Sequence, residues 1–293
     1  MKKDKIEKIL PTLISNLAPC QLCPHQCGVN RLEGETGFCR TGDFARVSSY
    51  GPHFGEEPPL SGRGGSGTIF FSNCNMGCCY CQNYEISQQG RGESVHPKQL
   101  AGMMLSLSKW GCHNINLVSP THVLPFILEA LLIAAEQGLD LPVVYNTGGY
   151  ERPEIIDLLE GIVDIYMPDM KYGNSENGLI YSKVADYPYY NQKAVARMFS
   201  QVGDLKIDGD GIASKGLLVR HLILPNQIAG SEEVFRFIAD KISPVTYVNI
   251  MDQYHPVYKA VADPDINRHI TPPEFQQAVN LAKQSGLKNI MGL

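Results

Sequence analysis

The chain has no excess of basic residues, because 25 Lys and Arg stand against 30 Asp and Glu and give a formal net charge of −5. This balance provides no general attraction to nucleic acid or to an anionic membrane. No apolar run is long enough to cross a bilayer, since the most apolar helix expected, residues 123–135, is interrupted by Glu129. Residues 1–8 are charged and lack the apolar segment of a secretory signal. We therefore expect a cytoplasmic protein with no nucleic-acid or membrane partner.

Cysteine, by contrast, is abundant, and eight of the nine cysteines fall in two short stretches. The first stretch, named here the N-terminal cysteine group, consists of Cys20, Cys23, Cys27 and Cys39. The second stretch contains Cys74, Cys78, Cys79 and Cys81. Dense C-x2-C-like spacing in a long chain without an export signal indicates metal binding in a reducing compartment rather than disulfide bonds.

Apolar strand-like segments alternate with helix-like segments from about residue 66 onward. A chain of 293 residues, 43% hydrophobic and 19% charged, has room for one large α/β domain with a small appendage. The expected strands are residues 68–72, 114–118, 142–145, 162–166, 217–224, 245–250 and 287–290. The expected helices are residues 97–110, 125–137, 153–160, 189–202, 231–242 and 272–286. The last helix begins with a capping box of Thr271 and Glu274.

These repeats predict a parallel sheet covered by helices. A complete eight-stranded barrel takes about 250 residues, and fewer than that follow residue 65, so we expect an α/β fold of the partial (βα)6 barrel type over residues 66–293. Residues 1–65 are rich in Cys, Gly and Pro and have no clear period. We expect them to form a small metal-binding module and a loop-like linker.

The second cysteine stretch follows the expected strand 68–72, and sites in such folds lie at the C-terminal ends of strands. Cys74, Cys78 and Cys81, named here the cysteine triad, have C-x3-C-x2-C spacing. A [4Fe–4S] cluster normally takes four cysteines, so three leave one iron open to a small molecule. The alternative is a zinc site completed by a distant ligand. Cys79 breaks the spacing, and we expect it to be a packed thiol.

The cysteine triad, followed by Gln82 and Asn83, resembles the signature of the radical S-adenosylmethionine (radical SAM) superfamily. Further segments resemble the PflX-type group, which is related to pyruvate formate-lyase activating enzymes. These segments are residues 20–27, 34–39, 67–71, 114–118, 145–150 and 219–221. The resemblance implies an oxidoreductase whose triad holds a [4Fe–4S] cluster with SAM on the open iron. One-electron reduction then cleaves SAM to methionine and a 5′-deoxyadenosyl radical that abstracts hydrogen from a substrate.

The resemblance also implies SAM-contacting residues at successive strand ends. The matching positions are Asn146, Thr147, Asp169, Lys171, Arg220 and His255. Asn146 replaces an Asp that helps to hold a monovalent cation in the activases, and residues 119–122 depart from the Gly-Gly-Glu segment that meets the SAM amino group. Lys171 and Arg220 suit a carboxylate ligand, since Arg offers a two-pronged fork. The alternative for Asp169 and Lys171 is a structural ion pair.

The N-terminal cysteine group has C-x2-C-x3-C-x11-C spacing and supplies four thiolates, a closed coordination shell. Structural zinc and a second iron–sulfur cluster both suit such a set, and its role is either to fold a small module or to relay electrons. Cys112 lies apart from both groups, and we expect it to be buried and inert.

Two functions are compatible with these features. The first is a radical SAM enzyme similar to glycyl-radical-activating enzymes, reduced by a flavodoxin- or ferredoxin-like donor. Its substrate would be either a protein, namely a glycyl radical enzyme, or a small molecule. The second is a non-catalytic iron–sulfur or zinc protein that transfers electrons or scaffolds a complex, and this alternative predicts no SAM binding.

Overall fold

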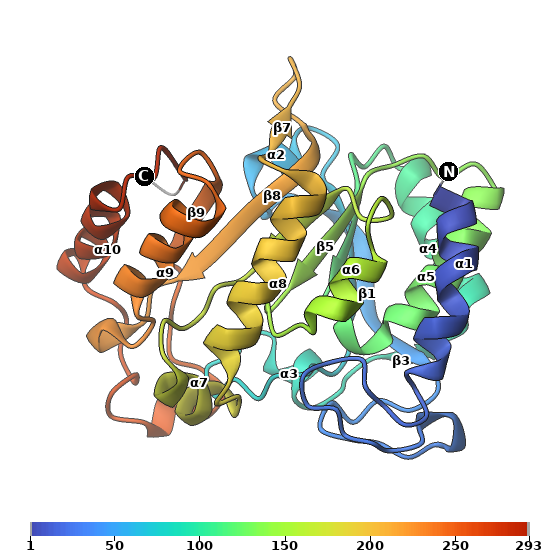
Figure 1. Ribbon diagram of the computed structural model, residues 1–293, viewed down its shortest axis with the longest axis horizontal. Coiled ribbons are helices and arrows are strands. Elements are labelled where there is room, and N and C mark those ends of the chain that lie inside the picture. The colour runs from blue at the N-terminus through green and yellow to red at the C-terminus, as the bar shows by residue number, and fades with distance from the viewer. Residues whose placement is uncertain (1, 292–293) are drawn as a thin grey trace.

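The computed structural model describes residues 2–291, which form a curved, mostly parallel sheet with helices on its outer face (Figure 1). Strand order is β10-β9-β8-β6-β5-β4-β2-β1-β3, with β7 paired to β8. Because β10 and β3 occupy the two edges, the sheet is open rather than a closed barrel. The parallel part agrees with the α/β architecture that the sequence predicts.

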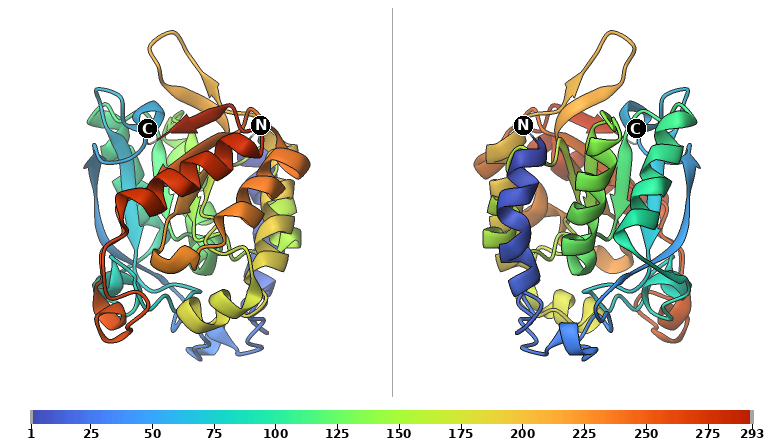
Figure 2. Two further views of the ribbon diagram at one scale, coloured as in Figure 1. Left: turned by 90° about the vertical axis from the view of Figure 1, so that its left-hand side faces the viewer. Right: turned by 90° about the vertical axis from the view of Figure 1, so that its right-hand side faces the viewer.

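The parallel strands are β2 (Ser66–Phe71), β4 (Ile115–Val118), β5 (Val143–Thr147), β6 (Ile165–Pro168), β8 (Ala213–Leu222), β9 (Tyr247–Met251) and β10 (Asn289–Met291). The central ones, β2, β4, β5 and β6, are short and almost wholly buried, whereas burial decreases through β8 and β9 toward the edge strand β10. The antiparallel strands are β1 (Ala45–His53), β3 (Glu93–Val95) and β7 (Lys206–Ile207). Figure 2 shows the β7–β8 hairpin projecting at the end opposite the N-terminal loops.

The helices follow the strands in the expected alternation. The longer ones are α1 (Lys2–Ser15), α4 (Pro97–Lys109), α5 (Leu124–Glu136), α8 (Tyr187–Val202) and α10 (Pro272–Gln284). The short ones are α2 (Pro58–Ser61), α3 (Tyr84–Ser87), α6 (Pro153–Leu158), α7 (Ser175–Ser182) and α9 (Ser231–Phe237). The capping box at α10 is confirmed, because the Thr271 side chain accepts from the Glu274 amide and Glu274 bonds back to Thr271. None of the helices within residues 2–291 is both long and apolar enough to span a bilayer.

Alternation along each strand divides its side chains between two faces. On β5 and β8, Tyr145 and Leu217 pack outward into the large helix-covered core, whereas Val144 and Leu218 pack inward around Leu60 of α2. Asn146 follows Val144 by two residues, and Arg220 follows Leu218 by two. The pleat therefore turns both polar side chains toward the inside of the curved sheet.

Two elements of the N-terminal segment depart from the sequence expectation of a loop-like linker. Strand β1 pairs with β2 and extends the main sheet, and α1 packs beside α5. Strand β1 contains Ser49, Gly51 and Pro52, residues that are typical of loops, so its sequence does not predict a strand. Pairing with β2 supplies the hydrogen bonds that the local sequence does not predict.

Candidate functional site

One cavity lies at the C-terminal ends of the parallel strands, and most of the predicted site residues line it. The lining includes Cys74, Cys78, Cys81, Asn146, Thr147, Asp169, Lys171 and Arg220. These residues come from segments spread between positions 74 and 220, and the parallel strands bring their ends together. Predicted contact residue His255 does not line this cavity. It is exposed and lies beside Gln82 and the Gln253 carbonyl, so a contact with SAM there stays a prediction.

Backbone and hydroxyl groups hold the cysteine triad in place. The Met76 amide donates to Cys74 Sγ (3.4 Å), Ser182 Oγ donates to Cys78 Sγ (2.9 Å), and Ser87 Oγ lies 3.1 Å from Cys81 Sγ. The C-terminal end of α7 supports the loop, since the carbonyls of Tyr181 and Ser182 accept from the amides of Cys79 and Gly77. Hydrogen bonds to sulfur of this kind tune thiolate ligands of iron–sulfur clusters.

The electrostatics of the triad suit a cationic metal centre. Burial raises the pKa of Cys74 to about 12 and that of Cys78 to about 11, so these thiols are protonated at neutral pH unless a metal displaces the protons. The positive charge of Lys171 acts in the opposite direction on Cys78. Three thiols facing a common cavity, with donors already placed on their sulfurs, fit a cluster held by three cysteines.

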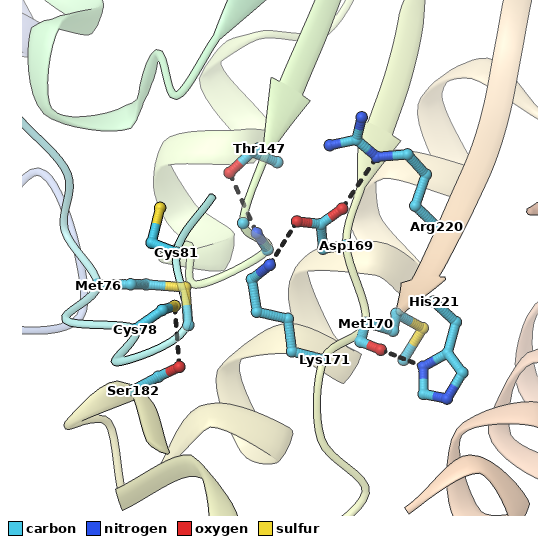
Figure 3. A network of polar contacts seen from close by, with 12 residues as sticks. Met76, Cys78, Cys81, Thr147, Asp169, Met170, Lys171, Ser182, Arg220 and His221 are labelled. Carbon is cyan, nitrogen blue, oxygen red and sulfur yellow. Dashed lines mark hydrogen bonds and ion pairs between the residues drawn. The ribbon is translucent and has the colours of Figure 1, made fainter. Parts of the chain in front are cut away.

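A charged network crosses the cavity opposite the triad, and Figure 3 shows Lys171 and Asp169 pointing toward each other between the cysteines and Arg220. Lys171 Nζ lies 2.6 Å from Asp169 Oδ2, and Arg220 Nε lies 2.9 Å from Asp169 Oδ1. Arg220 Nη2 also donates to Asn146 Oδ1 (2.7 Å). Burial alone would raise the pKa of Asp169, but the charges of Arg220 and Lys171 hold it below its ordinary value.

The backbone around Asp169 is fixed by its neighbours. Its amide donates to the Thr147 carbonyl (2.8 Å), and its carbonyl accepts from Asn191 Nδ2 and from the Tyr187 hydroxyl, both at 2.9 Å. Gly149 has a φ of +78°, and a Cβ there would lie 2.2 Å from the Asp169 carbonyl oxygen. The glycine therefore permits both a left-handed turn and a close approach of the strand end to Asp169.

Glu151 belongs to this region, although the sequence reasoning did not select it. Its side chain is fully buried and accepts hydrogen bonds from the hydroxyls of Thr121 (2.5 Å), Thr147 and Tyr145 (3.4 Å). Burial raises the pKa of Glu151 to about 7 despite these hydroxyls, which favour the anion. Glu151 thus ties the loop after β4 to the end of β5. A carboxylate two residues after the Asn-Thr-Gly-Gly segment was the available signal.

The N-terminal cysteine group is also brought together. Cys20, Cys23 and Cys39 are buried, Cys27 is half-buried, and all are free of disulfide bonds. Within residues 2–291, no group of three or more Cys, His, Asp or Glu side chains is placed so that it could hold a metal ion, and this includes both cysteine groups. Cys112 is buried, as expected.

Comparison with known proteins places this geometry in a family. The profile of the radical SAM superfamily matches residues 68–238. MJ0674, an uncharacterized protein of Methanocaldococcus jannaschii, is 35% identical over 278 residues, covering 92% of this chain and 75% of that protein. A second uncharacterized protein of the same organism, MJ0808, is 25% identical, with coverage of 95% and 81%.

Solved structures share the fold at low sequence identity. A radical SAM methyltransferase from Sphaerobacter thermophilus superimposes with a TM-score of 0.53 at 14% identity, covering 76% of this chain and 65% of that one. The structure of anSMEcpe with bound AdoMet gives 0.51 at 12% identity, covering 75% and 61%. This chain thus spans less than two thirds of either structure, and such identities support the fold alone. With the family profile and the MJ0674 match, they lead to one conclusion: the chain belongs to the radical SAM superfamily.

Proposed function

We propose that this chain cleaves SAM reductively at a [4Fe–4S] cluster held by the cysteine triad and, like the activating enzymes it resembles, abstracts hydrogen from a glycyl radical enzyme. One observation carries the proposal: the triad and the Lys171–Asp169–Arg220 network line the same cavity. A cluster held by Cys74, Cys78 and Cys81 would supply the single electron that reductive cleavage of the SAM carbon–sulfur bond requires. The protein orients the cofactor and excludes water.

Lys171 is the cation best placed to meet the SAM carboxylate. Its ammonium is fixed on one side by Asp169 Oδ2 and lies close enough to the triad for its charge to act on Cys78. Arg220, in contrast, already donates to Asp169 and Asn146. Arg220 therefore positions Asp169, which in turn orients the ammonium of Lys171.

Asn146 supports a departure from the activases. Its Oδ1 accepts from Arg220 Nη2 at 2.7 Å, so this oxygen is satisfied without a monovalent cation. The guanidinium of Arg220 thus takes the place of a cation at this oxygen. We expect SAM cleavage by this protein to be independent of K⁺ and Na⁺.

The first experiment tests the reaction itself. The protein is reconstituted anaerobically with iron and sulfide, reduced with dithionite and incubated with SAM, and 5′-deoxyadenosine is measured. Serine at any position of the triad abolishes the product, whereas Cys79→Ser, the matched control on the same loop, retains it. A fully loaded and reduced protein that forms no 5′-deoxyadenosine would favour the alternative of a non-catalytic iron–sulfur or zinc protein.

The second experiment tests the substrate. A glycyl radical enzyme is incubated with the reduced protein and SAM, with a reduced flavodoxin or ferredoxin as donor, and the glycyl radical is sought by electron paramagnetic resonance (EPR). A radical that depends on the triad supports an activase role. Turnover of SAM without any protein radical would instead favour a small-molecule substrate.

We further propose that the N-terminal cysteine group binds a metal centre, either zinc or a second iron–sulfur cluster.

A further inference from the structure

The N-terminal cysteine group is packed in the manner of a ligand set. The Phe38 amide donates to Cys27 Sγ at 3.4 Å, and the backbones of Cys20 and Val29 are joined by a 2.8 Å hydrogen bond. A Cβ at Gly37 would lie 2.5 Å from Cys27 Sγ, so only glycine lets the chain pass so close to this sulfur. The chain therefore packs closely around the Cys27 sulfur, and the four thiolates of the group would be enough to complete the shell of a metal centre.

A buried cation beside the group has no anionic partner. Arg31 is 1% exposed, its Nε and Nη2 both donate to the Gly42 carbonyl (3.0 and 2.8 Å), and its Nη1 has no hydrogen-bond partner. Within residues 2–291, no ion pair involves this guanidinium. A buried charge needs an opposite charge close by, because water no longer screens it. The guanidinium lies within electrostatic range of Cys39, so an anionic metal centre at the cysteines would be near enough to balance its charge.

The N-terminal loops also contact the loop that carries the triad. His25 Nε2 lies 2.9 Å from the Asn75 carbonyl, and Arg40 donates to the carbonyls of Ser87 (2.8 Å) and Gln88. Ser87 in turn contacts Cys81 Sγ. Figure 1 shows these loops at the same end of the sheet as α3 and α7.

One small cavity joins the two regions. It is lined by Phe38 and Arg40 from the N-terminal loops and by Cys74 of the triad. Phe38 and Arg40 flank Cys39 in the chain, so the cavity extends from Cys74 to the segment that carries Cys39. A metal centre at the N-terminal group would therefore lie next to the radical SAM site.

We infer that the N-terminal cysteine group holds an iron–sulfur cluster and that this cluster passes electrons to the cluster of the triad. Arg31 is its buried counter-ion. This inference rests on the proposed function. A low-potential one-electron donor of the flavodoxin or ferredoxin class reduces the N-terminal cluster, and the electron then moves to the triad cluster, where each SAM cleaved consumes one electron. Zinc would balance Arg31 equally well, but it has no redox chemistry and could not pass electrons to the neighbouring triad.

The metal is tested in a variant with serine at all three triad positions, reconstituted anaerobically. We expect about four iron atoms per chain to remain, as one [4Fe–4S] cluster requires, with a reduced-state EPR signal that SAM does not change. Cys112→Ser, a buried cysteine of neither group, is the control and should keep both clusters. Zinc in place of iron, or no metal, in the triad variant would overturn the assignment.

The relay is tested by counting electrons. Reduced wild-type protein is freed of reductant and mixed with excess SAM, and 5′-deoxyadenosine is measured per chain. If the relay operates, the wild type forms more than one equivalent of 5′-deoxyadenosine per chain, because both clusters contribute an electron. A Cys20→Ser/Cys23→Ser variant then forms at most one equivalent. One equivalent from both proteins would refute the relay. If the wild type forms none while the triad variant keeps its iron, the proposed function fails and the cluster assignment stands.

Arg31 gives a test that does not depend on removing a ligand. In the triad variant, Arg31→Met should shift the reduction midpoint of the N-terminal cluster to lower potential, because the added electron loses a neighbouring positive charge. Arg31→Lys should restore part of the shift, and thermal unfolding confirms that each variant is folded. An unchanged midpoint in Arg31→Met would contradict the counter-ion role.

Discussion

Replacing Glu151 with glutamine should raise stability at alkaline pH and leave it unchanged at acidic pH. The carboxyl is fully buried, and its pKa in the folded protein is about 7, against an ordinary value of 4.5. The folded protein therefore holds a proton between these two values that the unfolded chain has released. Its contribution to stability is complete below pH 4.5 and is lost as the pH rises through 7.

The size of the effect follows from the two pKa values. The difference corresponds to about 3 kcal/mol, at 1.36 kcal/mol for each pH unit. Glutamine is neutral at every pH and can keep its oxygen toward Thr121 and Thr147 while its amide donates to Tyr145. We expect Glu151→Gln and wild type to have similar free energies of unfolding at pH 4.5. At pH 8 the variant should be more stable by about 3 kcal/mol, or about 6 °C in Tm.

Thermal and denaturant unfolding of both proteins between pH 4.5 and 8 provides the measurement. Exposed Glu154, near the start of α6, serves as the matched control, because Glu154→Gln makes the same change of charge at the surface. A Glu151→Gln variant that is destabilised by the same amount at every pH would refute the reasoning. That result would mean that the three hydroxyls stabilise Glu151 as an anion throughout.

Three other substitutions test the site and the fold. Asp169→Asn leaves Lys171 and Arg220 without their shared anion, so the free energy of unfolding should fall by about 3 kcal/mol or more and SAM binding should weaken. Denaturant unfolding and equilibrium binding measure the two effects, and an unchanged affinity for SAM would argue against Lys171 as the carboxylate partner. Gly149→Ala should destabilise by about 3 kcal/mol through its positive φ and the clash with Asp169, whereas Gly102→Ala, with open space around it, should stabilise slightly. Thr271→Ala should lower the free energy of unfolding by about 1 kcal/mol through loss of the α10 cap, and Thr271→Ser should not.

Local patterns predicted most of the architecture. Apolar runs ending in turns located the parallel strands, and helical spacing with caps located helices such as α4, α5 and α10. The predicted helix 231–242 divides into α9 and a π-helical turn at Ile238–Ile242. Strand β1 was missed because its Gly and Pro are typical of loops and its partner β2 supplies the pairing.

The sequence by itself determined which cysteines form the candidate cluster site, because C-x3-C-x2-C spacing directly after a strand needs no distant residue to be recognised. It also selected Asp169, Lys171 and Arg220 as polar residues at strand ends. Only the tertiary structure decided which partners these and other polar residues take. Arg220 bonds to Asp169 and Asn146, Glu151 accepts from Thr147 of the cavity wall, and Arg31 is buried near Cys39. Such contacts join residues far apart in the chain. The free energy of a charged side chain depends on how far the fold has removed the water around it, which the local sequence does not specify.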